Sequence, residues 1–281
     1  MGSELPGKVF IVTGSNTGIG KATAQELARR RAHVFLACRS EAKALPVVEE
    51  IRRATGNQEV EFLPLDLADL ESVRAGAAAF LARKLPLHCL VNNAGLAGKG
   101  RTKDGFEITF GTNHLGHFLF TLLLLDVLKA SAPSRIVNVS SRAHFSARRI
   151  DWEAPREPTR SRTALPEYAV SKLANVLFTK ELARRLGGSG VTTYALHPGV
   201  VASDIWRRVP WGLRGLVKLF MISTEDGAAS TLHCATAPEL SEKTGRYYDE
   251  CKERHPSALA EDPSLAAELW RRSAEWTGIG T

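Results

Sequence analysis

The sequence has little of the residues that build zinc sites and disulfide frameworks. Its 281 residues include four cysteines, which stand far apart at Cys38, Cys89, Cys234 and Cys251. No two of them form a Cys-x-x-Cys pair, so their spacing predicts neither a zinc site nor a disulfide-stapled scaffold. We therefore expect reduced thiols, as in a cytosolic protein, and no metal in the functional site.

Long apolar runs are missing too. The longest, from Phe118 to Leu125, is interrupted by Thr121 and is too short to span about 30 Å of hydrocarbon. Residues 1–8 contain no apolar signal region, so we expect neither a secretory peptide nor a transmembrane helix. The sequence also has no repeat, linker or low-complexity tract, which favours a single domain over residues 1–281.

Charge of one sign does not dominate. The formal net charge is +7 and charged residues make up 24% of the chain, close to an average globular domain. The basic residues are spread along the chain without an arginine-rich tract or nucleic-acid motif, so we expect no nucleic-acid partner. A mild basic excess instead suits anionic ligands or an anionic membrane surface.

What the sequence does have is a regular alternation of strand-like and helix-like segments. The expected strands are residues 8–13, 33–38, 60–64, 88–92, 135–140 and 191–196, and the helices between them are residues 22–31, 42–55, 70–85, 106–129 and 165–186. Such a βαβ series predicts an α/β fold, a Rossmann-type doubly wound parallel sheet with right-handed crossovers.

The remaining segments complete this layout. A capping-box pattern at Ser223 opens a helix to about residue 237, and residues 246–248 are expected to form an edge strand. Asp262 and Pro263 begin a final helix through Trp276. Residues 148–162, rich in charge and proline, are expected to form an exposed loop.

A glycine-rich turn separates the first strand from the first helix. It consists of Gly14, Ser15, Asn16, Thr17, Gly18, Ile19 and Gly20. A helix that begins after such a turn offers free backbone N–H groups and the positive end of its dipole to a phosphate. Gly14 permits the turn, Gly18 lets the backbone approach a pyrophosphate, and Gly20 permits close packing of helix on strand. The turn indicates dinucleotide binding, although glycines also simply end strands.

The end of the second strand indicates which dinucleotide. Arg39 stands where NAD-binding folds usually place an acid for the ribose hydroxyls. Because an arginine can pair with a 2′-phosphate, Arg39 points to NADP(H). The alternative is a solvated surface arginine.

Two further strand ends border the same crevice. Asp66, followed by Leu67, could meet the adenine amino group, but it could equally start the next helix. After the fourth strand come Asn93, Ala94 and Gly95, and small residues at this point would let a cofactor lie against the carboxyl edge of the sheet.

Two reactive side chains stand one turn apart in the helix at residues 165–186. Tyr168 and Lys172 are at positions i and i+4 and so share a face. A nearby cation lowers the pKa of a tyrosine from its usual value near 10, so this tyrosine could exchange a proton with an alcohol or carbonyl. The alternative is an ordinary amphipathic helix with a surface tyrosine and lysine.

Other candidates flank this helix. Asn113 lies within an expected helix, where the alternative is a solvated amide, and Ser141 follows the fifth strand, where the alternative is a turn or cap. The turn after the sixth strand could border a nicotinamide through Pro198, Gly199, Val201 and Ser203. We expect His197 to be structural.

An apolar stretch with a basic border follows that turn. In residues 205–222, tryptophans and aliphatic residues alternate with Arg207, Arg208, Arg214 and Lys218. We expect a substrate-binding lid at about residues 203–223; the alternative is a buried helix covering the core. Basic residues contribute about 1 kcal/mol each near an anionic membrane, so this stretch could attach the protein reversibly.

In this order and spacing, the motifs resemble the short-chain dehydrogenase/reductase family. They are Gly14-xxx-Gly18-x-Gly20, Asn92-Asn-Ala-Gly95, Asn113, Ser141, Tyr168-xxx-Lys172 and Pro198-Gly199. The resemblance extends from Gly7 to about Tyr248. The peptides Asn-His-Leu-Gly-His-Phe and His-Pro-Gly-Val-Val are similar to those of the NADP-preferring retinol dehydrogenases.

The resemblance implies a role for each of four residues. Tyr168 would exchange the proton with the substrate oxygen, and Lys172 would lower its pKa and hold the nicotinamide ribose. Ser141 would polarise the same oxygen, and Asn113 would support a water relay to the lysine. The hydride would belong to NADP(H).

The resemblance also implies partners and a location. The expected substrate is a small apolar alcohol or aldehyde, namely retinol and retinal or lipid-derived aldehydes. The expected location is the endoplasmic reticulum membrane, peripheral on the cytosolic side, with a cytoplasmic enzyme as the alternative. A homodimer through the Asn113 and Tyr168 helices is also implied. Two other functions remain open: a steroid or other carbonyl reductase, and a nucleotide-binding scaffold without turnover.

Overall fold

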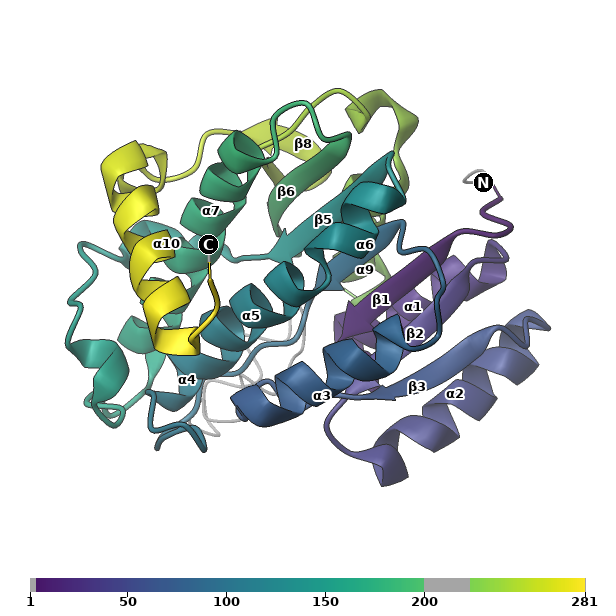
Figure 1. The fold of residues 1–281 in the computed structure, drawn as a ribbon, viewed down its shortest axis with the longest axis horizontal. Helices are drawn as coiled ribbons and strands as arrows, with labels where there is room; N and C mark the ends of the chain where they lie inside the picture. The colour runs from purple at the N-terminus through teal and green to yellow at the C-terminus, as the bar shows by residue number, and fades with distance from the viewer. Residues whose placement is uncertain (1–3, 200–222, 281) are drawn as a thin grey trace.

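The computed structural model describes residues 4–199 and 223–280. Within them, eight strands form one sheet in the order β3-β2-β1-β4-β5-β6-β7-β8 (Figure 1). The strands are β1 (Val9–Thr13), β2 (His33–Cys38), β3 (Val60–Pro64), β4 (Cys89–Asn92), β5 (Ser134–Val139), β6 (Val191–His197), β7 (Arg246–Asp249) and β8 (Lys252–Arg254). Every neighbouring pair is parallel except β7 and β8. The predicted doubly wound parallel sheet is confirmed.

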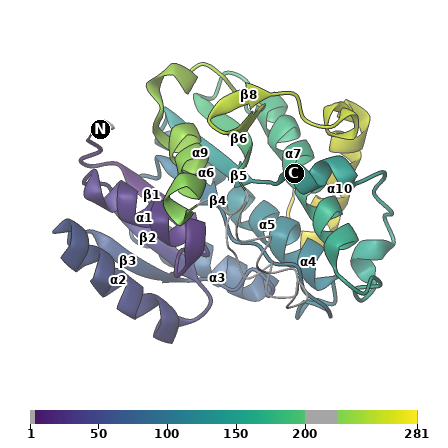
Figure 2. The same cartoon turned by 180° about the vertical axis from the view of Figure 1, so that it is seen from behind.

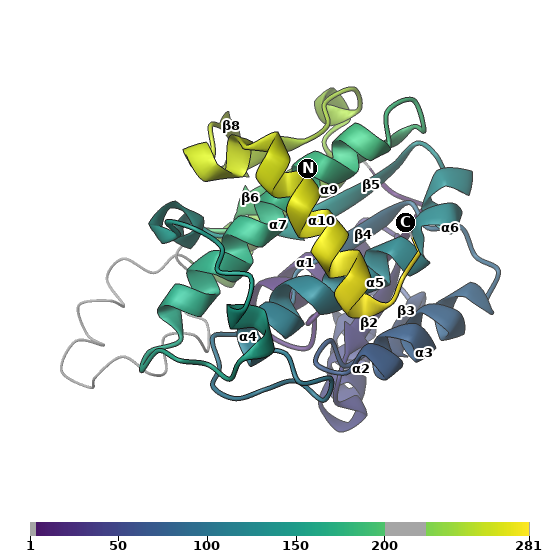
Figure 3. The same ribbon diagram turned by 60° about the vertical axis from the view of Figure 1, so that its left-hand side comes forward.

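Helices cover both faces of the sheet. One face carries α1 (Gly18–Arg29), α2 (Glu41–Thr55) and α9 (Thr224–Thr236), which come forward in Figure 2. The other face carries α3 (Leu70–Leu81), α5 (Gly116–Leu123), α6 (Leu125–Ala130) and α7 (Leu165–Arg185), while α10 (Pro263–Thr277) lies across α5 and α7 on the outside (Figure 3). The strands are therefore buried on both sides: along β1, Ile11 packs into one core and Val12 into the other.

The strand order places a crevice at a defined point of the sheet. From β1 the chain first adds β2 and β3 on one side and then crosses over to add β4 on the other. At such a switch point the connections leave β1 and β4 in opposite directions, so the carboxyl ends of these strands flank a gap where α/β proteins bind ligands.

The prediction of one continuous helix over residues 106–129 is wrong. The structure has a short helix α4 (Ile108–Phe110), a π-helical segment (Gly111–Leu115, the π segment below), α5, and then α6 from Leu125. Two glycines mark the close packing of this region: a Cβ at Gly111 would run into Thr102, and one at Gly116 into the backbone of Leu67. Apolar spacing does not reveal one extra residue in a turn, so the sequence pattern missed the π segment.

The prediction of an exposed loop at residues 148–162 is wrong in part, because some of its side chains are buried. Ile150 and Pro155 are buried, and the guanidinium of Arg156 lies 4.4 Å from the centre of the Phe106 ring. Cationic side chains can lie over aromatic faces while staying partly hydrated, so a charged composition did not mean full exposure.

The end of the sheet also differs from the expectation. The strand expected at residues 246–248 exists as β7, but it is not an edge, because it pairs with β6 on one side and β8 on the other. The predicted caps are confirmed: Ser223 accepts a hydrogen bond from the Asp226 amide (3.0 Å), and Asp262 accepts one from the Ser264 amide (2.8 Å). No helix among the described residues is long and apolar enough to cross a membrane.

Candidate active site

The turn between β1 and α1 leaves the start of the helix open. Thr17 is the N-cap in an extended conformation, without a side-chain hydrogen bond to the helix, and the first turn of α1 has no acidic residue. Gly18 has φ +57°, and no side chain or backbone of the described residues beyond its chain neighbours lies within 4 Å of the position that a Cβ would take. Free backbone N–H groups and the positive end of a helix dipole are the features that bind anions at helix N-termini.

The same turn packs against the segment after β4. A Cβ at Gly14 would lie 2.8 Å from the Cβ of Ala94, so only glycine fits there. The Asn93 side chain donates to Thr13 O (2.8 Å), and Thr13 Oγ1 accepts from the amides of both Asn93 and Ala94, each at 2.9 Å. These contacts hold two of the predicted cofactor segments together. The buried Ser15 hydroxyl donates inward to Val12 O (2.8 Å), which leaves the backbone of Ser15 as the part of this residue that could contact a cofactor.

Arg39 is exposed at the end of β2 and has no hydrogen-bond or ion-pair partner among the described residues. Its charge is therefore available to an anion beside the open start of α1. Asp66 lies after β3, and its Oδ1 accepts a hydrogen bond from the Ala68 amide (3.0 Å). The alternative, that Asp66 starts the next helix, is wrong, because the N-cap of α3 is Asp69. The Leu67 side chain is buried in the core.

Tyr168 and Lys172 lie together in the first turns of α7, but their electrostatics differ from the expectation. Burial lowers the pKa of Lys172 to about 8, and its Nζ donates to Val139 O (2.9 Å) while lying 5.4 Å from the centre of the Tyr168 ring. Burial also raises the pKa of Tyr168 to about 12, against a smaller lowering by its hydrogen bond with the Ser141 side chain. The expected lowering by Lys172 is wrong for the protein alone, because loss of solvation outweighs it.

Asn113 lies fully buried in the π segment, and its side chain joins two other segments, the one after β4 and the first turns of α7. Its Oδ1 accepts from the Leu96 amide and its Nδ2 donates to Leu96 O, both at 2.9 Å, and Nδ2 also donates to Ser171 Oγ (3.0 Å). A Cβ at Gly95 would lie 3.2 Å from Lys172 Nζ and 3.5 Å from Asn113 Oδ1. The segment after β4, Asn113 and Lys172 therefore meet in one place.

Ser141 is fixed by its own helical turn. It caps the 3₁₀ turn Arg142–Ser146 by accepting from the Ala143 amide (3.1 Å), and its carbonyl accepts from His144 Nδ1 (2.6 Å). His144 Nε2 in turn accepts from the Ser257 amide (3.1 Å), so the C-terminal part of the chain helps to hold Ser141. Ser141 thus has both of the roles weighed from the sequence: it is a cap and it reaches Tyr168.

The turn after β6 is described only in part. Pro198 and Gly199 follow the buried His197, whose pKa burial lowers to about 4, so this histidine is neutral at physiological pH. Val201, Ser203 and the expected lid at residues 203–223 lie, but for Ser223, outside the described residues.

Comparison with known proteins agrees with this geometry. A family model for short chain dehydrogenases matches residues 8–152. The chain belongs to the short-chain dehydrogenase family. Retinol dehydrogenase 12 of Mus musculus is 49% identical over 280 residues, which cover 98% of this chain and 88% of that protein.

Solved structures of other proteins share the fold of this dehydrogenase. A protein from Mycobacterium paratuberculosis has a TM-score of 0.80 and 34% identity, covering 99% of this chain and 96% of its own. RhlG of Pseudomonas aeruginosa, solved as an active-site complex with NADP, has a TM-score of 0.71 and 25% identity over 92% of this chain and 98% of its own. The chain is an oxidoreductase of a family that uses nicotinamide cofactors.

Sequence reasoning missed two polar residues of the dehydrogenase site. Ser171 Oγ accepts a hydrogen bond from the side-chain amide of Asn113. The His117 ring is hydrogen-bonded to Asn113 O (3.0 Å) and to Thr13 Oγ1 (2.8 Å). Both stand next to predicted residues in the sequence or one turn away, at i−1 from Lys172 and i+4 from Asn113. That spacing was a usable signal for His117.

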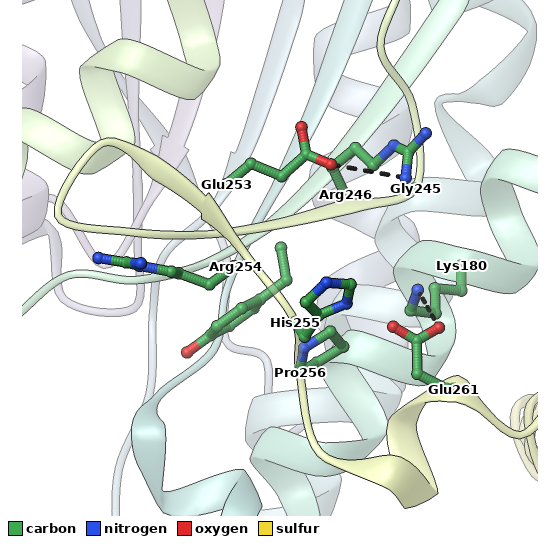
Figure 4. A pocket seen from close by; sticks show the side chains of 9 residues that line it. Lys180, Gly245, Arg246, Glu253, Arg254, His255, Pro256 and Glu261 are labelled. Carbon is green, nitrogen blue, oxygen red and sulfur yellow. Dashed lines mark hydrogen bonds and ion pairs between the residues drawn. The ribbon is translucent and has the colours of Figure 1, made fainter.

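A hollow of about 250 Å³ lies beside β7 and β8, away from the predicted site residues (Figure 4). Its lining comes from the start of β7, from β8 and the residues after it, and from the second half of α7. Lys180 pairs with Glu261 (2.7 Å) and Arg246 with Glu253 (3.5 Å), so most of its charges neutralise one another. None of the predicted site residues of the dehydrogenase lines it.

Proposed function

We propose that this dehydrogenase interconverts an apolar alcohol and aldehyde with NADP(H), most directly retinol and retinal or lipid-derived aldehydes. One observation carries the proposal: Tyr168, hydrogen-bonded to Ser141, lies beside the buried ammonium of Lys172, which itself meets Asn113 and the segment after β4. The similarity to retinol dehydrogenase 12 supports the substrate class.

The protonation states favour Tyr168 as the acid in aldehyde reduction. With a pKa of about 12, the tyrosine keeps its proton at neutral pH and can give it to the carbonyl oxygen. Ser141 would hold that oxygen by a hydrogen bond, and the Lys172 ammonium would stabilise the phenolate left behind. The bound cofactor supplies the hydride, so the aldehyde becomes the alcohol and NADPH becomes NADP⁺. Asn113 would fix the lysine side of the site.

The residues that would hold the cofactor fit a phosphorylated dinucleotide. The open start of α1 would bind the pyrophosphate through the turn from Gly14 to Gly20, with backbone groups of Ser15, Asn16, Thr17 and Ile19. The unpaired Arg39 would bind the 2′-phosphate. Asp66 and Leu67, Asn93 to Gly95, and Pro198 and Gly199 would line the rest, with Val201 and Ser203 beyond the described residues.

Exposed apolar side chains near the reacting groups support an apolar substrate. Phe145 is 53% exposed four residues after Ser141, and Leu165 is 52% exposed three residues before Tyr168. Large apolar side chains left open beside a polar site give a substrate with a long hydrocarbon chain something to contact.

The test is a turnover screen with NADPH on retinal, medium-chain aldehydes and steroid ketones. We expect retinal and long aldehydes to be reduced faster than steroid ketones; the reverse order would make the enzyme a steroid reductase. NADPH binding without turnover of any of them would support the silent scaffold.

Tyr168→Phe tests the proton transfer. General acid catalysis typically contributes about 10² to 10⁴-fold, so kcat should fall by at least about 100-fold while NADPH binding measured by fluorescence survives. Tyr248→Phe is a matched control, because the buried Tyr248 hydroxyl has no hydrogen-bond partner among the described residues. Wild-type kcat in Tyr168→Phe would remove the proton role from this residue.

Peripheral contact with the cytosolic side of the endoplasmic reticulum membrane is a proposal from sequence, because residues 205–222 lie outside the described part of the chain. We expect sedimentation with anionic liposomes at low salt, abolished by charge reversal of Arg207, Arg208, Arg214 and Lys218. Sedimentation that is absent, or equal with neutral and anionic liposomes, would leave this stretch as lid or core only and argue for a cytoplasmic enzyme. Homodimerisation through the Asn113 and Tyr168 helices is likewise a proposal, for which the oligomeric state in solution is the measurement.

A further inference from the structure

His117 occupies an unusual position for a buried histidine. It lies in the first turn of α5, 2% exposed, between the end of β1 and the π segment. Burial, with a smaller contribution from the nearby Lys172 charge, lowers its pKa to about 4, so the ring is neutral at physiological pH. A neutral imidazole has one N–H donor and one acceptor nitrogen.

The partners decide which nitrogen carries the proton. Nδ1 lies 3.0 Å from Asn113 O, and a carbonyl can only accept, so Nδ1 donates. Nε2 is then the acceptor, and Thr13 Oγ1 at 2.8 Å donates to it. The other contact open to the Thr13 proton, Val91 O, is longer at 3.4 Å.

The Thr13 hydroxyl is fully used in this arrangement. It gives its single proton to His117 and accepts from the amides of Asn93 and Ala94 at 2.9 Å each. A continuous chain of hydrogen bonds therefore runs from the amides after β4, through Thr13 and His117, to the carbonyl of Asn113. Each member has the donor or acceptor that its neighbour needs.

We infer that His117 is a positioning residue that joins the cofactor-side strand ends to the π segment, so that Asn113 is held in register with the turns after β1 and β4. The expected changes in kcat and KM rest on the proposed function, whereas the expected structural changes rest on the hydrogen-bond chain alone. Without the Nδ1 donor, Asn113 O loses its side-chain link to β1, and among the described residues the Asn113 side chain keeps its bonds to Leu96 and Ser171.

The same segment offers a matched control. His114, also fully buried, points the other way and bonds Ser273 of α10 through Nε2 (2.9 Å). His114→Phe and His117→Phe remove buried histidines three residues apart, but only His117→Phe breaks the chain to Thr13. Thr13→Val removes the hydroxyl at nearly constant volume, and Thr13→Ser keeps it.

The experiment measures kcat and the KM for NADPH in these variants. We expect His117→Phe to lower kcat about tenfold with KM for NADPH changed less than about threefold, because a displaced group remote from the chemistry costs rate rather than cofactor affinity. Thr13→Val should lower kcat about as much as His117→Phe and should also raise the KM for NADPH, and Thr13→Ser should restore both values. Because both changes break the same chain, the double variant Thr13→Val with His117→Phe should have no lower kcat than Thr13→Val alone. Equal kcat losses in His114→Phe and His117→Phe, or multiplicative losses in the double variant, would overturn the inference.

Amide hydrogen exchange of the cofactor-free protein separates this inference from the proposed function. Exchange at residues 111–117 should accelerate in His117→Phe, exchange at Asn93 and Ala94 in Thr13→Val, and exchange in α10 in His114→Phe. If the wild-type enzyme turns over none of the substrates, this pattern still decides the inference. Unchanged exchange at residues 111–117 in a folded His117→Phe protein would overturn the inference. If His117→Phe does not fold, unchanged exchange at Asn93 and Ala94 in Thr13→Val would overturn it instead.

Discussion

At the scale of single residues, the site depends on one buried cation. The Lys172 ammonium has its hydrogen bond to Val139 O but has lost most of its solvation, which is why its pKa falls from 10.5 to about 8. Above this folded value but below the unfolded value, the unfolded chain binds the proton and the folded chain does not. The free energy of unfolding must therefore rise with pH in that window.

This linkage can be measured by comparing the wild type with Lys172→Met. Between pH 7 and pH 9.5 the free energy of unfolding of the wild type should gain about 2 kcal/mol relative to the variant, since one unit of pKa shift is worth about 1.4 kcal/mol. Urea denaturation at both pH values gives the difference. A gap that stays constant with pH would show that Lys172 is not desolvated in solution.

Arg39 carries the cofactor preference at the same scale. Arg39→Asp replaces an unpaired cation by an anion next to the expected 2′-phosphate, so NADPH should lose affinity relative to NADH by about ten- to hundredfold. Dissociation constants for both cofactors measure it. Arg53→Asp makes the same change of net charge at the far end of α2 and should leave the ratio unchanged. An unaltered ratio in Arg39→Asp would mean that Arg39 only faces solvent.

The sequence indicated residue types here better than side-chain directions. The spacing of Gly14, Gly18 and Gly20 was sufficient to predict a phosphate turn, because backbone geometry limits such turns to few residues. It could not show that the Ser15 hydroxyl donates inward to Val12 O or that burial raises the pKa of Tyr168, since the direction of a hydroxyl and the burial of a side chain are set by the packing of the folded chain.

At the scale of elements, α10 is the support of the π segment. Ser273 bonds His114, and the Trp276 ring lies 6.1 Å from Phe110 and 6.2 Å from Phe106 in ring-centre distance. Arg156 covers the same ring from the loop after Ser141. Three segments distant in the sequence thus meet on the outer side of Asn113.

Trp276→Ala should weaken this contact. Removing a partly buried aromatic side chain should lower the free energy of unfolding by about 2 to 3 kcal/mol, less than for a fully buried tryptophan. Trp276→Phe keeps an aromatic ring and should cost clearly less, and urea denaturation of both variants is the measurement. Equal stability of Trp276→Ala and the wild type would show that α10 docks without this ring.

Element types were predictable, whereas their interruptions were not. The apolar period of residues 106–129 is helical throughout, and a π turn keeps apolar residues inward while shifting the register by one. The charges of residues 148–162 suggested an exposed loop, but Arg156 lies over the ring of Phe106, and the Trp152 ring lies under Arg272 of α10. Both partners, Phe106 and Arg272, come from other parts of the chain. Tertiary partners decided both cases.

At the scale of the whole molecule, the parallel strands followed from the sequence with one omission, whereas their order came from the structure. The alternation from Val9 to His197 fixed six parallel strands, because right-handed crossovers leave few topologies. β8 was missed since its three residues have no apolar period, and it forms through a tight turn at Glu250 and Cys251, both with positive φ.

That short strand has a consequence for the protein in crowded solution. Unpaired strand edges are templates for aggregation, and here the last strand offers the three exposed charges of Lys252, Glu253 and Arg254 to any incoming chain. At the opposite edge, β3 carries the Glu61–Arg83 ion pair (2.8 Å) and ends in Pro64, which has no N–H to donate. A further strand from another molecule would have to desolvate charges at either edge, so neither edge of this sheet favours growth by strand addition.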